Sequence, residues 1–178
     1  RESIQKYNLR FVKLIGEDIK AKHWDTFYQC YLATIEKKWG GAYLTRSFFS
    51  CLSNKLKNKI LLVLCYDDDT PVAGALNLIG PDALYGRNWG SLRDIPFLHF
   101  ETCYYQAIEF AIQNGVERVE AGAQGLHKVS RGYLPNKTYS AHKIMNPQFE
   151  EAIKRFLSHE ASQNSEEALL INKVSPYK

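Results

Sequence analysis

A carboxylate stands on the apolar side of a segment with helical periodicity. Plotted at about 100° per residue, residues 94–114 place Glu101 near the middle of an arc formed by Phe97, Phe100, Tyr104, Ala107, Ile108 and Ala111. The opposite side carries His99, Thr102, Gln106, Glu109 and Gln113. Because an unpaired carboxylate in a core costs several kcal/mol, we expect a cation or a set of donors to meet Glu101. The side chain is therefore a candidate proton acceptor in catalysis, with a structural ion pair as the alternative.

Several residues near the ends of two expected strands could meet this carboxylate. Ligands gather outside the carboxyl ends of strands in open sheets that contain parallel pairs. The candidates at such ends are Arg87, Trp89, His127, Lys128 and Arg131.

A second polar row follows one face of an expected strand over residues 116–123. Alternation places Arg118, Glu120, Gly122 and Gln124 on one face and small apolar residues on the other. This row predicts a lined cleft with Glu120 as a second candidate base and Gln124 as a binding residue. The alternative is an exposed sheet face in which Arg118 pairs with an acid on a helix.

Residues 121–149 contain no acidic side chain and form a basic segment. Arginine supplies a planar fork for phosphate, lysine a point charge, and glycine an accessible backbone N–H group. The segment therefore predicts a phosphate site, and a merely solvated basic loop is the alternative. The residues we assign to binding here are His127, Lys128, Arg131, Gly132, Tyr133, which could stack on a base, and His142.

Composition excludes several classes of protein. The 178 residues are 45% hydrophobic, which suits one compact domain, and the net charge of +4 is too small to indicate nucleic-acid binding by bulk electrostatics. No run approaches the roughly 18 uncharged apolar residues of a membrane span. The four cysteines form no CxxC pair, so we expect reduced thiols, a cytoplasmic location and no metal site.

The order of expected elements indicates an α/β (α+β) fold with a mixed, mostly antiparallel sheet flanked by helices. A helix between the third strand of a meander and the next strand makes those two strands parallel. The expected strands are 8–15, 59–66, 71–79, 83–89, 116–123 and 138–145, and the expected helices are 17–38, one capped by Thr45, 94–114 and 147–160. This is the order of the GNAT acyltransferase fold.

The sequence resembles one bacterial family through a set of motifs. They are FYxxYxxT at 27–34, YLTxxFF at 43–49, GRNWG at 86–90, FLHFExCYYQxIEFAI at 97–112, EAGAQGxHK at 120–128, RGYxP at 131–135 and SAH at 140–142. The sequence is similar to FemAB-like predicted N-acyltransferases of the GNAT superfamily, which are described as peptidoglycan biosynthesis or recognition proteins.

The resemblance implies a domain organisation and a reaction. It implies that residues 1–178 form a single acyltransferase domain, the C-terminal half of a tandem protein whose N-terminal domain would be a partner. The implied reaction transfers an acyl or aminoacyl group from acyl-CoA or aminoacyl-tRNA, as a co-substrate, to an amine. A peptidoglycan precursor is one candidate acceptor.

The sequence departs from the GNAT pattern at the start of the long helix. The usual acetyl-CoA signature, Gln or Arg followed by GxG or GxA, is missing, and residues 91–99 read SLRDIPFLH. The basic segment is therefore the alternative phosphate site, which favours a donor other than acetyl-CoA.

These residues lead to a functional hypothesis with named roles. Glu101 or Glu120, with His127, would accept the proton of the amine, and Arg87 with nearby backbone amides would stabilise the oxyanion. Lys128 and Arg131 would hold the donor phosphate, and the remaining binding candidates are Trp89, His99, Gln124, Gly132, Tyr133 and His142. The alternative hypothesis is a catalytically silent module that binds a peptidoglycan precursor or a tRNA acceptor end.

Overall fold

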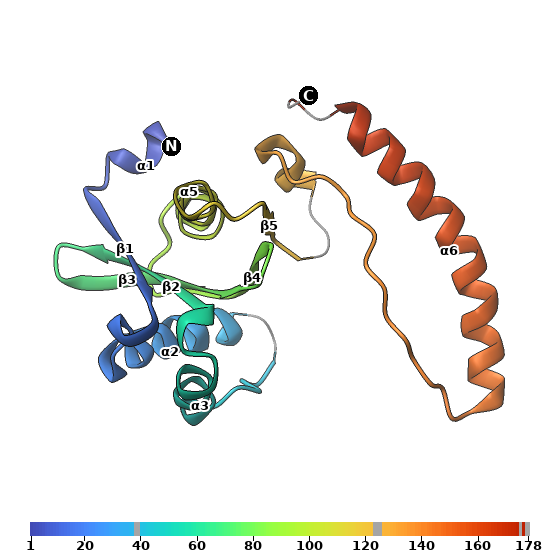
Figure 1. Ribbon diagram of the computed structural model, residues 1–178, viewed down its shortest axis with the longest axis horizontal. Helices are drawn as coiled ribbons and strands as arrows, with labels where there is room; N and C mark the ends of the chain where they lie inside the picture. Colours follow the sequence, from blue (N-terminus) through green and yellow to red (C-terminus); the bar gives the residue numbers. More distant parts are fainter. Residues whose placement is uncertain (38–39, 123–125, 175, 177–178) are drawn as a thin grey trace. The chain divides into compact units, whose positions relative to one another are not determined.

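The computed structural model describes the chain except residues 38–39, 123–125, 175 and 177–178. Contacts divide it into two compact units, Arg1–Ala123 and Gln124–Lys178. Figure 1 shows the course of the chain.

The first unit contains a five-stranded sheet whose strands lie in chain order, β1-β2-β3-β4-β5, among the described residues. Neighbours from β1 to β4 are antiparallel, and β4 and β5 are parallel, which confirms the expected mixed sheet. The strands are β1 Leu9–Ile15, β2 Ile60–Asp67, β3 Thr70–Ile79, β4 Ala83–Ser91 and β5 Arg118–Glu120.

Helices cover both faces of this sheet (Figure 1). One face carries α2 Ala21–Glu36 and α3 Arg46–Leu56, and the other carries a helix built from α4 Leu98–Phe100, a π-helical turn Glu101–Tyr105 and α5 Gln106–Asn114. A short helix α1 Glu2–Gln5 precedes β1, and 3₁₀ turns lie at Gly16–Asp18 and Lys57–Lys59.

Successive side chains of the central strands point to opposite faces of the sheet, so the hydrophobic core has one part on each face. Leu62, Leu64 and Leu76 pack with Trp24, Phe27, Tyr31 and Phe49 of α2 and α3. Leu61, Val63, Ala75 and Leu84 pack with Ala107 and Phe110 of α5. Because both faces are covered, β2 reads as a continuous apolar run instead of an alternating one.

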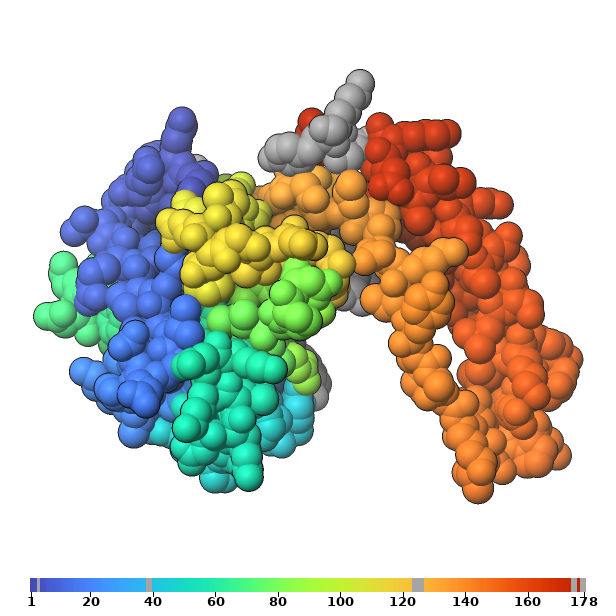
Figure 2. All heavy atoms as spheres, viewed as in Figure 1, coloured from blue at the N-terminus to red at the C-terminus, as the bar shows by residue number. Residues whose placement is uncertain are grey.

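The second unit holds the 3₁₀ turn Leu126–Arg131 and the helix α6 Pro147–Val174. The expected strand at 138–145 is wrong, because these residues have no regular structure. The helix extends past Glu160, where we expected it to end, and ion pairs between Glu150 and Lys154 and between Glu151 and Arg155 support its first turns. Figure 2 shows α6 in orange and red as a rod of exposed side chains.

The helix after β4 also begins later than the expected Asp94. Phe97 adopts a left-handed backbone with φ of 67°, and regular helix starts at Leu98. The expected end is confirmed, because Gly115 takes the left-handed conformation that terminates a helix. Strand β5 is only three residues long, shorter than the expected 116–123.

All four cysteines are free thiols. Burial raises the pKa of Cys30 and of Cys65 to about 12, so both stay protonated near neutral pH. In the described part of the chain, no helix is long and apolar enough to cross a membrane. The described residues also bring together no group of three or more His, Cys, Asp or Glu side chains that could hold a metal ion.

Thr45 caps α3, as the sequence predicts, because its Oγ1 accepts a hydrogen bond from the backbone N–H of Phe48 at 3.3 Å. We expect Thr45→Ala to lower the free energy of unfolding by about 1 kcal/mol, since one backbone donor loses its partner. Urea denaturation measures this change. The control is Thr138→Ala, an exposed position outside regular structure, and equal midpoints for the two variants would contradict a role for the cap.

Candidate active site

The sheet opens where β4 and β5 separate. The two strands pair only from Ala83 with Arg118 to Tyr85 with Glu120, whereas β4 continues to Ser91 beside β3. From Gly86 onward, no described strand pairs with the β5 side of β4. This edge therefore presents backbone N–H and C=O groups that could bind an extended ligand as an added strand.

A β-bulge lies at the start of this open edge. Leu76 pairs with Asn88 and Asn77 pairs with Gly86, so Arg87 is the extra residue on β4. A bulge bends its strand and redirects a side chain, and Arg87 is exposed. Its role in stabilising an oxyanion stays a prediction.

Glu120 lies at the point of separation, on the face of the sheet that α2 covers. Tyr85 is its partner across the parallel pair and is in turn opposite Leu78, which packs against the α2 core. Directly opposite residues share a face, so Glu120 is on that face too. Its side chain is 34% exposed, and its Oε1 lies 3.5 Å from Nη2 of Arg118.

The Glu120 carboxylate is only loosely paired. The same Arg118 nitrogen lies nearer to Asp82, at 2.9 Å from Oδ2. Among the residues that the structure describes, Glu120 thus has one ionic neighbour, at 3.5 Å, and its half-exposed carboxylate can meet an incoming amine.

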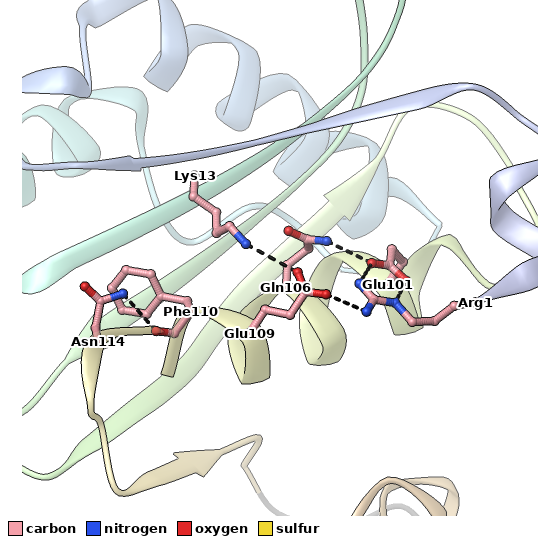
Figure 3. Close-up of polar contacts among 7 residues, drawn as sticks. All are labelled: Arg1, Lys13, Glu101, Gln106, Glu109, Phe110 and Asn114. Atoms are coloured by element: carbon pink, nitrogen blue, oxygen red, sulfur yellow. Dashed lines mark hydrogen bonds and ion pairs between the residues drawn. The ribbon is translucent and has the colours of Figure 1, made fainter. Parts of the chain in front are cut away.

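Glu101 lies on the face of the sheet that α5 covers, and both oxygens of its carboxylate accept hydrogen bonds. Its carboxylate accepts hydrogen bonds from Arg1 Nε at 2.9 Å, Arg1 Nη2 at 2.5 Å and Gln106 Nε2 at 2.8 Å (Figure 3). The side chain is 5% exposed. The expected cation therefore exists, and it is Arg1, which was not among the candidates that the sequence offered.

The π-helical turn explains why the helical plot misplaced two polar residues. The backbone N–H of Gln106 donates to the carbonyl of Glu101, five residues earlier, so these two side chains become neighbours. Thr102 and Gln106 are buried, although the plot at 100° per residue put them on the polar side. The extra residue in this π-helical turn rotates every later side chain around the helix axis, relative to its place in a regular α-helix.

The Glu101 cluster extends to a second acid. Arg1 Nη1 lies 2.5 Å from Glu109 Oε1, and Lys13 Nζ lies 3.5 Å from Glu109 Oε2 (Figure 3). Hydrogen bonds from Arg1 to Glu101 and then Glu109 raise the pKa of the Arg1 guanidinium, and Arg1 lowers the pKa of the Glu109 carboxyl. The sheet thus separates the two candidate bases: Glu120 borders the opening, and Glu101 belongs to an ion-pair cluster.

The start of the helix after β4 does not form an anion cradle. Leu98 N–H donates to the Ile95 carbonyl, both Phe100 N–H and Glu101 N–H donate to the Phe97 carbonyl, and Pro96 has no N–H. Free backbone donors are what a helix N-terminus offers to phosphate. The geometry agrees with the missing acetyl-CoA signature.

The rings of two predicted binding residues, Trp89 and His99, contact each other in a tilted arrangement at this helix. The rings of Trp89 and His99 lie with centroids 4.5 Å apart, and Trp89 packs against the α5 side of the core. Both are half-buried. A binding role for either one stays a prediction.

The second unit brings some of the basic residues together. Arg131 Nη1 donates to the His127 carbonyl at 2.5 Å and to Ser130 Oγ at 3.1 Å, and His142 Nε2 lies 3.0 Å from Ser140 Oγ. Burial lowers the pKa of Lys128. Gly132 has a φ of 88°, Tyr133 is half-buried, and the predicted residue Gln124 lies outside the described residues.

The sequence alone did not point to Arg1 as the partner of Glu101, and we did not use Tyr85 as the cross-strand neighbour of Glu120. Arg1 pairs with a residue 100 positions away, so no local spacing points to the contact. Tyr85 could have been found, because the parallel pairing that we expected puts it beside Glu120.

Comparisons with known proteins place the chain in a family. A profile of the FemAB-like family, described as peptidoglycan biosynthesis/recognition, matches residues 1–178. No curated protein sequence matches the chain significantly.

Solved structures share the fold at low sequence identity. An aminoglycoside acetyltransferase, meta-AAC0020, from an uncultured soil metagenomic sample in complex with sisomicin is 14% identical with a TM-score of 0.54, covering 80% of this chain and 98% of its own. A predicted acetyltransferase with acetyl-CoA from Clostridium acetobutylicum is 10% identical with a TM-score of 0.53, covering 76% and 95%. The aminoglycoside N-acetyltransferase AAC(6')-Iy in complex with CoA is 6% identical with a TM-score of 0.50, covering 78% and 95%. The chain has the GNAT acyltransferase fold and belongs to the FemAB-like family.

Proposed function

We propose that the protein is an N-acyltransferase that moves an acyl or aminoacyl group from a phosphate-bearing donor to an amine. The observation that carries this proposal is the separation of β4 from β5, which leaves the edge of β4 from Gly86 open beside Glu120. An extended donor arm would bind along this edge through backbone hydrogen bonds. Its carbonyl carbon would then lie near the point of separation.

The chemistry assigns a role to each group at the opening. A neutral amine attacks the donor carbonyl, its C–N bond forms, and Glu120 accepts the proton that the nitrogen loses. Backbone N–H groups of β4 and the Arg87 guanidinium stabilise the oxyanion of the tetrahedral intermediate. The intermediate collapses with cleavage of the C–S bond of a thioester or the C–O bond of an ester, and the leaving group takes up a proton.

The donor is either acyl-CoA or aminoacyl-tRNA. The absence of an anion cradle at the described helix start favours phosphate binding elsewhere, and we assign it to Lys128 and Arg131 of the basic segment. The family description favours an amine of a peptidoglycan precursor as the acceptor. We also propose that the chain is one acyltransferase domain of a longer tandem protein, as its resemblance implies.

A donor panel tests the proposal. Acetyl-CoA, a longer acyl-CoA and an aminoacyl-tRNA minihelix are titrated by thermal shift, and each is then incubated with a stem peptide that carries a free amine for product detection by mass spectrometry. A ligand at about 100 times its Kd stabilises the fold by roughly 2.7 kcal/mol. We expect one donor class to stabilise the protein and to give an amide product.

Arg131→Ala is the control for phosphate binding and should lose the response to that donor. Stabilisation without product from any donor would favour the silent binding module instead. Neither stabilisation nor product from the whole panel would contradict the proposal.

A further inference from the structure

A complete set of guanidinium contacts surrounds Arg1. Its Nε and Nη2 reach the two oxygens of Glu101 at 2.9 and 2.5 Å, and its Nη1 reaches Oε1 of Glu109 at 2.5 Å. The Tyr105 ring centroid lies 5.1 Å from Cζ. All three guanidinium nitrogens therefore meet carboxylate oxygens, and a π-face lies beside the cation, which is a geometry that an ammonium group cannot reproduce.

Residues other than Arg1 hold these acceptors in place. Gln106 Nε2 donates to Glu101 Oε1 at 2.8 Å, and Lys13 Nζ lies 3.5 Å from Glu109 Oε2. Glu101 is more than nine-tenths buried in the π-helical turn. The acceptors are therefore positioned by the turn, by α5 and by β1, independently of the short helix that carries Arg1.

Residues 1–8, the segment that carries Arg1, border a cavity. The Arg1 side chain is 41% exposed, and Arg1 directly precedes the four-residue helix α1. A cavity of about 330 Å³ lies beside it and is lined by Arg1, Ile4, Gln5, Asn8, Leu9, Phe11 and Glu101. Four of these lining residues belong to residues 1–8, so withdrawal of that segment would leave Leu9, Phe11 and Glu101 to contact the aliphatic part of a ligand.

We propose that Glu101, Glu109 and Tyr105 form a recognition site for a guanidinium group, which Arg1 of the same chain fills. A ligand that carries a guanidinium group, such as the arginine side chain of another peptide, enters when residues 1–8 withdraw. The site lies on the α5 face of the sheet, whereas Glu120 lies on the α2 face, so this inference does not depend on the proposed acyl transfer.

Chemical rescue tests the site. Arg1→Ala should lower the unfolding midpoint by about 4 °C or more, because it leaves Glu101 buried without its cation. Methylguanidinium at millimolar concentration should raise the midpoint of this variant, and methylammonium should not. The unchanged protein should respond to neither, since Arg1 fills the site.

Two further variants make the result specific. Adding Glu101→Gln to Arg1→Ala should abolish the rescue. Arg10→Ala should show no rescue, because the exposed Arg10 has Cζ 4.8 Å from the Tyr66 ring centroid and pairs with the exposed Asp69 at 3.8 Å, so its loss leaves no buried carboxylate unpaired. If Arg1→Ala does not fold, Arg1→Lys replaces it, since lysine keeps a charge but not the fork. An equal response to both cations, no response, or a response that survives Glu101→Gln would overturn the proposal.

Discussion

Replacing Glu120 by glutamine is expected to slow acyl transfer by about 100- to 10,000-fold, with little change in the unfolding midpoint. The amide keeps the shape of the side chain but cannot accept the proton of the attacking amine. Stability should hardly change, because the lost contact is a half-exposed ion pair with Arg118 at 3.5 Å, and such pairs contribute about 0 to 1 kcal/mol. Single-turnover kinetics with the donor found by the panel measures the rate, and thermal unfolding measures stability.

Glu101→Gln is the matched control and should show the opposite pattern. Its carboxylate accepts three hydrogen bonds from Arg1 and Gln106, so we expect a loss of about 1 to 3 kcal/mol in the free energy of unfolding. The transfer rate of the folded protein should stay within tenfold of the original. A folded Glu101→Gln variant without activity, beside an active Glu120→Gln variant, would reverse the assignment of the base.

Gly90→Ala is expected to prevent stable folding. A Cβ atom at this position would lie 1.8 Å from the Cys30 carbonyl oxygen, 2.2 Å from its carbonyl carbon and 2.8 Å from the Tyr31 nitrogen. These atoms belong to the backbone of α2, so relief requires the helix to move away from β4 and to withdraw Phe27 and Tyr31 from the core. We expect a cost of about 3 kcal/mol or more in the free energy of unfolding.

Gly41→Ala is the control for this prediction, because nothing lies within 4 Å of its added Cβ atom. Urea denaturation followed by circular dichroism compares the two variants. Equal urea midpoints for Gly90→Ala and Gly41→Ala would show that α2 does not lie directly on β4.

The contact of Gly90 with the α2 backbone also positions α2 beside β4, the strand that borders the proposed site. A folded Gly90→Ala variant should therefore also lose transfer activity.

Much of the fold could be predicted because its signals are local. The apolar run from Ile60 to Cys65, the turns at 67–69 and 80–82, the cap at Thr45 and the helix end at Gly115 each depend on neighbours within a few residues. The parallel pairing of β4 with β5 followed from the helix between them. Glu101 was recognised as a carboxylate that needs a partner, and the structure provides one.

The errors arise where distant contacts override local preference. Residues 138–145 have the alternation of a strand, but a strand forms only where a neighbour accepts its hydrogen bonds, and none of the described strands pairs with them. Asp94 and Pro96 resemble a helix start, yet Ile95 is buried with Leu98 in the core, and regular helix begins only after Phe97. The role of the basic segment stays a prediction.

The sequence by itself determined the kinds of element, their order and the residue types available for chemistry, because periodicity, caps and turns act over short distances. Only the tertiary structure decided which side of the sheet each carboxylate occupies and which cation it meets. A single inserted residue in the turn at 101–105 rotates the helix after it, and the Arg1–Glu101 pair joins residues 100 positions apart. Such contacts depend on how the assembled layers bring distant backbone together, which no short stretch of sequence encodes.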